Sequence, residues 1–221
     1  VRGPRAQTDR DLYKEAINNL MANQKNLNIA EGSVEDLLLD SNDLNIEGVI
    51  TDNGMKIRSG SVVLTTGTFL RGLIHIGERK IPAGRMGEAP AIGLAKTLFK
   101  KGFRLGRLKT GTPPRLDKNS IDYSSLIAQP GDYPPEPFSS LTNQILTTQV
   151  DCHITTTTLK TNNIIRNNLH NSPLYSGQIE SIGPRYCPSL EDKIVRFADR
   201  ENHTIFLEPE GLNSNLIYPN G

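Results

Sequence analysis

The sequence predicts a mixed α/β protein, and three observations carry that prediction. Apolar residues recur at helical spacing in three stretches, 8–23, 90–101 and 162–170. Short apolar runs bounded by turn residues lie between the first two of these stretches, as is typical of strands. The chain has 221 residues, which is enough to bury a sizeable core in one large domain or two small ones.

The first helix is expected over residues 8–23, because Leu12 and Leu20 fall on one face. Thr8 is followed three residues later by Asp11, a spacing typical of a capping box at the start of a helix. We therefore expect an amphipathic helix capped by Thr8.

The next segments predict strands. The runs 34–39 and 46–50 are short and apolar, and the pair Asn53-Gly54 that follows them is a strong signal for a hairpin turn. The β-branched run 62–68 is expected to form a buried strand. It ends in Thr-Gly-Thr, and a glycine at that end of a strand lets a ligand approach the backbone, although a simple glycine turn explains the same pattern.

A second helix is expected over 90–101, with two lysines at its C-terminal end and Gly102 as its C-cap.

The Gly-x-x-x-x-Gly spacing of 106–111 resembles a phosphate-binding loop, but Thr112 stands where such a loop requires lysine. We therefore reject a phosphate-binding loop. A Gly-x-Gly-x-x-Gly fingerprint for dinucleotides is also missing from the sequence.

The character of the sequence changes after residue 115, where we place a boundary between domains 1–115 and 116–221. The second domain opens with a proline-rich loop, continues with the β-prone run 154–158 and then forms the helix 162–170. The chain begins without Met and without an apolar leader, so we expect it to be an internal piece of a longer protein.

Charge is distributed unevenly along the chain. Residues 71–118 contain 12 Lys and Arg against 3 Asp and Glu, whereas both flanking segments are acidic. A segment this basic fits a polyanion such as RNA or a dinucleotide pyrophosphate, and a solvated basic face that pairs with the acidic flanks fits equally well. The candidate RNA-binding residues are Lys100, Lys101, Arg104 and Arg107.

Composition excludes several classes of protein. No apolar run approaches the roughly 18 residues of a membrane-spanning helix, and no membrane association is predicted. The 2 cysteines make neither a disulfide framework nor a zinc site, so we predict no metal and a reducing, intracellular compartment. Aromatic residues make up 5% of the chain, too few to predict a stacking platform for single-stranded nucleic acid.

The segment 183–197 has the most chemical character. Ser189 with Asp192 three residues later predicts a capped helix start, so Cys187 lies two residues before a helix N-cap and beside Arg185. A helix N-terminus and a guanidinium both lower the pKa of a thiol, which makes Cys187 and Arg185 the candidate catalytic residues, with a small buried hydrophobe as the alternative. Cys152 is next to Asp151, which raises a thiol pKa, and we expect a structural role for it.

Several of these segments together resemble the GidA/MnmG family, the flavoprotein subunit of the system that modifies the wobble uridine of tRNA. The resemblance spans the chain and is most specific in Lys-Thr-Gly-Thr-Pro-Pro-Arg at 109–115 and in 183–197. The other matching segments are 3–7, 34–37, 64–70, 206–211 and 217–219. The resemblance implies part of an FAD-binding Rossmann-like domain of the glutathione-reductase type, followed by a second α+β insertion domain.

The resemblance also implies site residues. Val34 matches an FAD contact of the family, Thr66 and Gly67 are expected beside the flavin, and Ala91 stands where many members have a serine that touches it. The segment 183–197 matches the part assigned to NAD, which adds these expected cofactor contacts: Gly183, Pro184, Arg185, Tyr186, Lys193 and Phe197. Cys187 matches a cysteine important for activity, either as a nucleophile at uridine C6 or as a general acid or base.

The implied activity attaches a carboxymethylaminomethyl or related group to C5 of the uridine at tRNA position 34. Methylene-tetrahydrofolate would supply the one-carbon unit, NADH would reduce the flavin, and a GTPase of the MnmE type would join a homodimer in a heterotetramer with two copies of each. The compartment would be cytoplasmic, with the mitochondrial matrix as the alternative. Two other functions stay open. The first is a folate- and FAD-dependent tRNA uridine methyltransferase, although such an enzyme would not be expected to carry the segments 109–115 and 183–197. The second is a non-catalytic fragment that binds tRNA or the partner.

Overall fold

The computed structural model describes residues 5–109, 111–179 and 189–221. They form two compact units. Unit 1 comprises the described residues of Val1–Leu27, Lys109–Leu169 and Gly183–Gly221, and unit 2 those of Asn28–Leu108 and His170–Ile182. The domain boundary near residue 116 stays a prediction.

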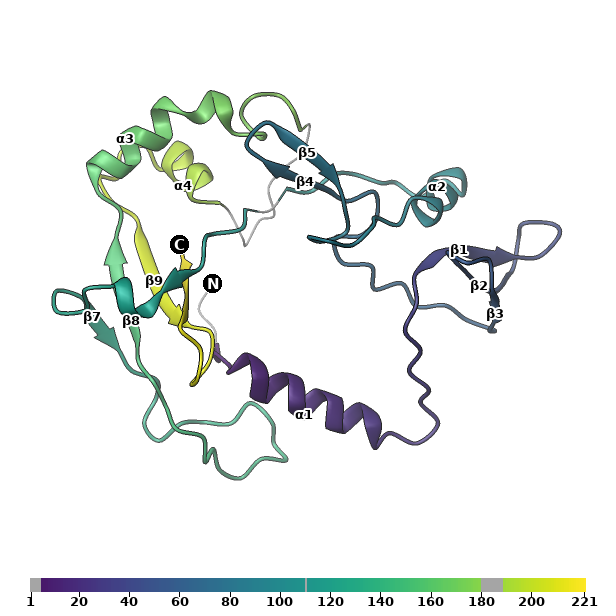
Figure 1. Ribbon diagram of the computed structural model, residues 1–221, viewed down its shortest axis with the longest axis horizontal. Coiled ribbons are helices and arrows are strands. Elements are labelled where there is room, and N and C mark those ends of the chain that lie inside the picture. Colours follow the sequence, from purple (N-terminus) through teal and green to yellow (C-terminus); the bar gives the residue numbers. More distant parts are fainter. Residues whose placement is uncertain (1–4, 110, 180–188) are drawn as a thin grey trace. The chain divides into compact units, whose positions relative to one another are not determined.

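Unit 1 is built on an antiparallel five-stranded sheet with the strand order β6-β10-β9-β8-β7 (Figure 1). Helices α3 and α4 pack together where β8 ends and β9 begins, whereas α1 has no buried residue. The elements of this unit are α1 (Arg10–Ala22), β6 (Leu116–Asp117), the 3-10 helix η1 (Lys118–Ser120), β7 (Ile127–Gln129), β8 (Cys152–Thr156), α3 (Leu159–Asn167), α4 (Leu190–Arg196), β9 (Thr204–Pro209) and β10 (Leu216–Asn220). A second 3-10 helix, η2 (Leu169–Asn171), follows α3.

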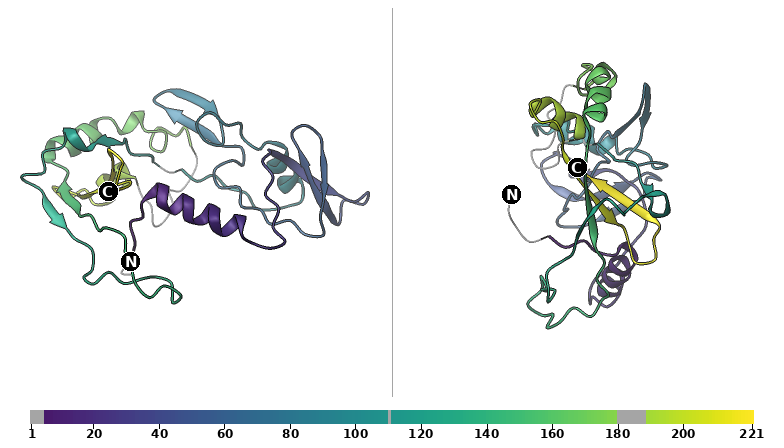
Figure 2. Two further views of the ribbon diagram at one scale, coloured as in Figure 1. Left: turned by 60° about the horizontal axis from the view of Figure 1, so that its bottom comes forward. Right: turned by 90° about the vertical axis from the view of Figure 1, so that its left-hand side faces the viewer.

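Unit 2 contains two antiparallel sheets and one helix. Strands β1, β2 and β3 form a three-stranded sheet against which α2 packs, and β4 pairs with β5 (Figure 2). The elements are β1 (Val34–Leu39), β2 (Ile46–Thr51), β3 (Lys56–Arg58), β4 (Leu73–Ile76), β5 (Arg79–Pro82) and α2 (Gly93–Lys100). Among the helices in the described ranges, none combines the length and apolar character needed to cross a membrane.

The mixed α/β prediction is confirmed, as are most of the individual elements. Helix α1 covers most of 8–23, α2 lies within 90–101, and Gly54 has the positive φ of 81° that the turn between β2 and β3 requires. The expected helix at 162–170 begins earlier, at Leu159, because Thr158 caps it with a hydrogen bond from the backbone N–H of Thr161.

Two expectations are wrong. The cap of α1 is Asp9 and not Thr8, because the Asp9 carboxylate accepts the free backbone N–H groups of Asp11 and Leu12. The run 62–68 forms no strand, and Val63 is 86% exposed. A strand needs a neighbour to take its backbone hydrogen bonds, and none of the described strands pairs with this run.

Candidate functional site

The four residues expected on the flavin side all belong to unit 2. Val34 opens strand β1, Thr66 and Gly67 belong to a turn, and Ala91 lies two residues before helix α2. The turn closes with a 3.0 Å hydrogen bond from the backbone N–H of Phe69 to the carbonyl of Thr66. Gly67 has a φ of 53°, the left-handed conformation that favours glycine.

Backbone hydrogen bonds join Ala91 to this turn. Its N–H donates to the carbonyl of Phe69 at 2.8 Å, and its carbonyl accepts from the N–H of Arg71 at 3.1 Å. Leu70 and Ala91 accordingly form a parallel bridge. The segment before α2 is therefore fixed against the turn that contains Gly67.

Side chains of β1 hold the other side of the same segment. Glu35, the neighbour of Val34, accepts a hydrogen bond at 2.8 Å from the backbone N–H of Gly93, the first residue of α2. Asp36 accepts a second bond, from the hydroxyl of Thr97 at 3.0 Å. Strand β1, helix α2 and the Gly67 turn thus form one hydrogen-bonded cluster that carries all four residues expected beside the flavin.

This cluster suits a flat ring held through the protein backbone. A Cβ atom added to Gly67 would meet no atom within 4 Å, so open space lies beside the turn. Ala91 and Thr66 are half-buried, which leaves part of each residue accessible. The residues present therefore fit an isoalloxazine ring that approaches the backbone of Gly67 and Ala91.

The four candidate RNA-binding residues lie at and after the C-terminal end of α2. Lys101 forms an ion pair with Asp43 at 3.5 Å and donates to the backbone carbonyl of Asp43. Arg107 donates to the backbone carbonyl of Arg71 at 2.8 Å. Lys100 and Arg104 are exposed and have no ion pair within the described ranges. Lys101 therefore fits a basic face that pairs with acidic residues of the protein. Lys100 and Arg104 fit cations that could meet a polyanion.

A histidine that the sequence analysis missed extends this basic region. His75 on β4 lies opposite Lys80 on β5. Burial lowers the pKa of His75, and the charges of Lys80 and Arg107 lower it further. The imidazole is therefore neutral at physiological pH, between cations, and its buried Nδ1 has no hydrogen-bond partner in the described part of the chain. The β4–β5 pairing brings these groups together, and no local pattern in the sequence indicates it.

In unit 1, Lys193 and Phe197 of the NAD-matching segment line a cavity of about 530 Å³. Arg200 and His203 lie on the same cavity, and the Arg200 guanidinium sits 5.2 Å from the centre of the Phe197 ring. His203 is 5% exposed, and its Nε2 has no partner among the described residues. Burial lowers the pKa of His203, and Arg200 and Lys193 add to this shift.

The lining combines two cations, the rings of Phe197 and Phe206, and a neutral imidazole with one acidic residue, Glu201. The cations and rings suit a phosphate-bearing nucleotide, and Glu201 opposes its negative charge. The sequence analysis singled out Lys193 and Phe197 but not Arg200 or His203, which come to the cavity from the loop before β9. The remaining candidates lie outside the described residues: Gly183, Pro184, Arg185, Tyr186 and Cys187.

The helix that follows these residues starts as predicted. Ser189 and Asp192 form the capping box of α4, and Asp192 is 3% exposed. Lys109, from the Lys-Thr-Gly-Thr-Pro-Pro-Arg segment, forms a 2.6 Å ion pair with Glu191. Burial would raise the pKa of Glu191, but the hydrogen bond from Lys109 helps to hold it below its usual value. Lys109 therefore ties that segment to the first turn of α4.

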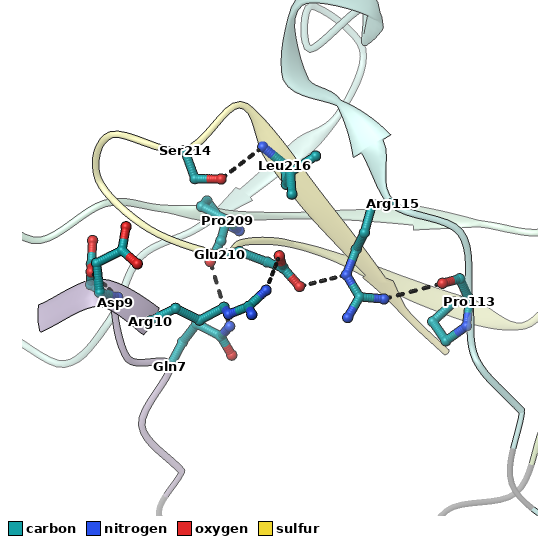
Figure 3. A network of polar contacts seen from close by, with 10 residues as sticks. Gln7, Asp9, Arg10, Pro113, Arg115, Pro209, Glu210, Ser214 and Leu216 are labelled. Atoms are coloured by element: carbon teal, nitrogen blue, oxygen red, sulfur yellow. Dashed lines mark hydrogen bonds and ion pairs between the residues drawn. The ribbon is translucent and has the colours of Figure 1, made fainter. Parts of the chain in front are cut away.

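A second charged network involves the turn between β9 and β10 (Figure 3). Glu210 is 7% exposed and accepts hydrogen bonds from Arg115 and, at 3.2 Å, from Arg10. The Arg115 guanidinium also lies 4.3 Å from the centre of the Tyr218 ring. One buried carboxylate thus joins the start of α1 to the end of the 109–115 segment. Glu210 directly follows the apolar strand β9, and an acidic residue beside an apolar strand is the sequence signal for such a buried pair.

Glu208, on β9, is 4% exposed and accepts from Arg5 at 2.7 Å and from Asn220 at 3.1 Å. This carboxylate also affects Cys152. Burial raises the pKa of the Cys152 thiol, and the charge of Glu208 raises it further. The thiol is therefore protonated at neutral pH, which is in line with the structural role expected for it.

Comparison with known proteins gives one family over the whole chain. The family model described as "Glucose inhibited division protein A" matches residues 1–221. Two curated relatives bear the name "tRNA uridine 5-carboxymethylaminomethyl modification enzyme MnmG". The relative from Granulibacter bethesdensis is 54% identical and that from Syntrophotalea carbinolica 52% identical. Each match covers 100% of this chain and 35% of the relative, so the chain spans about a third of their length.

A solved structure agrees with these matches. The chain is similar to GidA of Aquifex aeolicus in its form I crystal with a TM-score of 0.87 and 49% sequence identity, over 99% of this chain and 37% of that one. The second crystal form of the same protein gives a TM-score of 0.85. These similarities confirm the predicted fold class, an α/β fold of the GidA type. The chain therefore belongs to the GidA family, the family of glucose inhibited division protein A.

Proposed function

We propose that this chain is part of a flavoprotein that adds a carboxymethylaminomethyl-type group to C5 of the wobble uridine in certain tRNAs. The observation that carries the proposal is the match of the whole chain to the family, with relatives of that name at 54% and 52% identity. The hydrogen-bonded cluster of Val34, Gly67 and Ala91 supports it, because the residues expected beside a flavin are also neighbours in space.

In this proposal FAD binds against the Gly67 turn, with Val34, Thr66 and Ala91 as its contacts on this chain. When bound, the flavin supplies transfer of an electron pair, and NADH is its reductant. Unit 2 would contribute a fixed backbone, at Gly67 and Ala91, against which the flavin is held. The cavity lined by Lys193, Phe197 and Arg200 supports a site for the phosphates of the dinucleotide, with the cations opposite the negative charge.

Cys187 is the proposed nucleophile. Its thiolate adds to uridine C6, which moves the C5–C6 π electrons toward the C4 carbonyl and makes C5 nucleophilic. C5 then attacks the methylene carbon of methylene-tetrahydrofolate in its iminium form, and the C=N π electrons move to the folate nitrogen. The C5 proton and tetrahydrofolate leave next, which gives an exocyclic methylene on C5. A primary amine adds to this methylene carbon as the thiolate departs, and the C5–C6 double bond is restored. Arg185 favours the charged thiolate. A role for Cys187 as general acid or base is the alternative within the same proposal.

The proposed partners follow from the same family membership. tRNA binds along the basic region at and after the C-terminal end of α2, where Lys100 and Arg104 are free of ion pairs within the described ranges. The protein acts as a homodimer with a GTPase of the MnmE type, in the cytoplasm. The division into a flavin-binding part at 1–115 and a second domain at 116–221 belongs to this proposal.

The test is mass spectrometry of tRNA nucleosides from cells that lack the gene, rescued with the wild type or with Cys187→Ser. We expect the deletion to remove the C5-modified wobble uridine and the wild type alone to restore it. Full restoration of the modified uridine by Cys187→Ser would show that the thiol is not needed for the reaction. An intact wobble modification in the deletion would overturn the proposal, and loss of 5-methyluridine in its place would favour the methyltransferase. Restoration by a variant that binds no flavin would favour the non-catalytic alternative.

A further inference from the structure

Glu35 links two segments that the proposed function places beside the flavin. It follows Val34 directly in β1, and its Oε1 accepts a 2.8 Å hydrogen bond from the backbone N–H of Gly93. Gly93 is two residues after Ala91. One side chain thus connects the strand that carries Val34 to the segment that carries Ala91.

This carboxylate accepts a hydrogen bond from the first residue of helix α2. Its own N-cap residue, Ile92, has no side-chain hydrogen bond to the helix, and its first turn contains no acidic residue. The free backbone N–H groups at the start of a helix need an acceptor from outside the helix. Glu35 supplies it from 58 residues earlier in the chain.

A bulge in β1 aims the side chain at the helix. Val34 pairs with Thr51 and Asp36 with Ile50, so the register shifts at Glu35. In a regular strand consecutive side chains point to opposite faces, yet Glu35 and Asp36 both bond to α2. The extra residue of a bulge allows this arrangement, and bulges often re-aim side chains next to functional sites.

The contact between β1 and the first turn of α2 is so close that it allows only a glycine at position 93. A Cβ atom on Gly93 would lie 2.6 Å from Oε1 of Glu35 and 2.7 Å from its backbone oxygen. A real Cβ atom cannot approach backbone so closely. Gly93 therefore lets β1 lie directly against the first turn of α2, and the glycine and the carboxylate define one position for the Ala91 segment relative to Val34.

We propose that Glu35 is a positioning residue for the flavin. It does not touch the ring. It acts through Gly93, holding the backbone of Ala91 at a fixed place relative to Val34, so that the two contacts meet the same ring. This inference rests on the proposed function, because that function makes Val34 and Ala91 flavin contacts.

The test compares Glu35→Gln with Glu35→Asp in the native-length protein, with FAD titrated against the apoprotein by flavin fluorescence. Glutamine keeps an oxygen at the same reach and loses the charge, whereas aspartate keeps the charge and is one methylene too short. We expect Glu35→Gln to bind FAD within about twofold of the wild type, and Glu35→Asp to raise the dissociation constant about tenfold and to shift the flavin absorption spectrum.

Thr97→Val is the matched control, because it removes the Asp36 bond one turn further along the same helix. It should lower the unfolding temperature without changing FAD affinity. Wild-type affinity in Glu35→Asp would overturn the inference, as would weak binding in Glu35→Gln beside normal binding in Glu35→Asp. An equal loss of FAD affinity in all three variants would also overturn it, because the contacts between β1 and α2 would then act only on the stability of the fold. A wild type that binds no FAD would instead count against the proposed function.

Discussion

Asp9 and Leu212, which are 203 residues apart, are joined by a 2.6 Å hydrogen bond from the backbone N–H of Leu212 to Oδ2 of Asp9. The other carboxylate oxygen, Oδ1, caps α1 through the N–H groups of Asp11 and Leu12, each at 2.9 Å. These bonds lower the pKa of Asp9, with that from Leu12 as the largest cause. One side chain therefore both starts a helix and attaches it to the turn after β9.

We expect Asp9→Ala to lower the unfolding temperature of the native-length protein by a few degrees, because it leaves three backbone N–H groups without their acceptor. Thr8→Ala is the matched control and should change nothing, since Thr8 does not cap the helix. Circular dichroism against temperature measures both variants. A larger loss in Thr8→Ala than in Asp9→Ala would contradict the structure.

Glu210 predicts a dependence of stability on pH. Burial would raise the pKa of this carboxyl, but the hydrogen bonds from Arg115 and Arg10 outweigh burial and lower it below the ordinary value of 4.5. A carboxyl with a lowered pKa stabilises the folded state above that ordinary value, and the contribution disappears as pH falls through the folded-state pKa. The stabilising effect of Glu210 should therefore be complete at neutral pH and be lost below about pH 4.5.

Glu210→Gln tests this dependence. It should cost about 2 kcal/mol at pH 7, most of it from the bond to the half-buried Arg115 rather than to the exposed Arg10. The cost should shrink as pH falls below about 4.5, because the wild-type carboxyl then becomes protonated and is as neutral as the glutamine amide. Urea unfolding at neutral and acidic pH measures the difference. The same cost at both pH values would show that charge is not involved.

Two glycines with positive φ give a second matched pair. Gly48 has a φ of 145°, and a Cβ added there would lie 2.0 Å from the carbonyl oxygen of Ile57. Gly54 has a φ of 81° and open space around it. Gly48→Ala should cost more than about 3 kcal/mol and disrupt β1–β3, whereas Gly54→Ala should cost about 1 kcal/mol, from backbone strain alone. Hydrogen exchange of the β2 amides reports on both substitutions, and equal protection in the two variants would argue against the close approach at Gly48.

Most features that depend on near neighbours could be predicted from the sequence, although the cap of α1 is Asp9 and not the expected Thr8. The capping box of Ser189 and Asp192, the turn at Gly54 and the apolar spacing of the helices are all local patterns, and each was predicted correctly. The 62–68 run was wrongly predicted to be a strand, because only its local composition was considered. Its composition favours a strand, but composition does not say whether a neighbouring strand is present to accept its hydrogen bonds.

Features that depend on distant residues could not be predicted in this way. Glu35 reaches Gly93 and Glu210 reaches Arg10 only when segments 58 and 200 residues apart in the chain come together. Nothing in the spacing of these residues indicates such contacts. The resemblance to the family predicted Val34 and Ala91 as separate flavin contacts and did not predict that they are neighbours. The hydrogen bonds of the structure place both residues in one cluster.

The basic region at and after the C-terminal end of α2 gives the last prediction. Lys100 and Arg104 have no ion pair in the described part of the chain, whereas Lys101 is already paired with Asp43. Each phosphate contact that is lost reduces the salt dependence of tRNA binding by about one unit of slope. The double variant Lys100→Glu, Arg104→Glu should therefore weaken binding and flatten the slope by about two units. Lys101→Glu should change the slope by less than about one unit, because its charge is partly neutralised before tRNA arrives. Filter binding over a range of salt concentrations measures both slopes, and an unchanged slope in the double variant would identify this region as a solvated face without contact to tRNA.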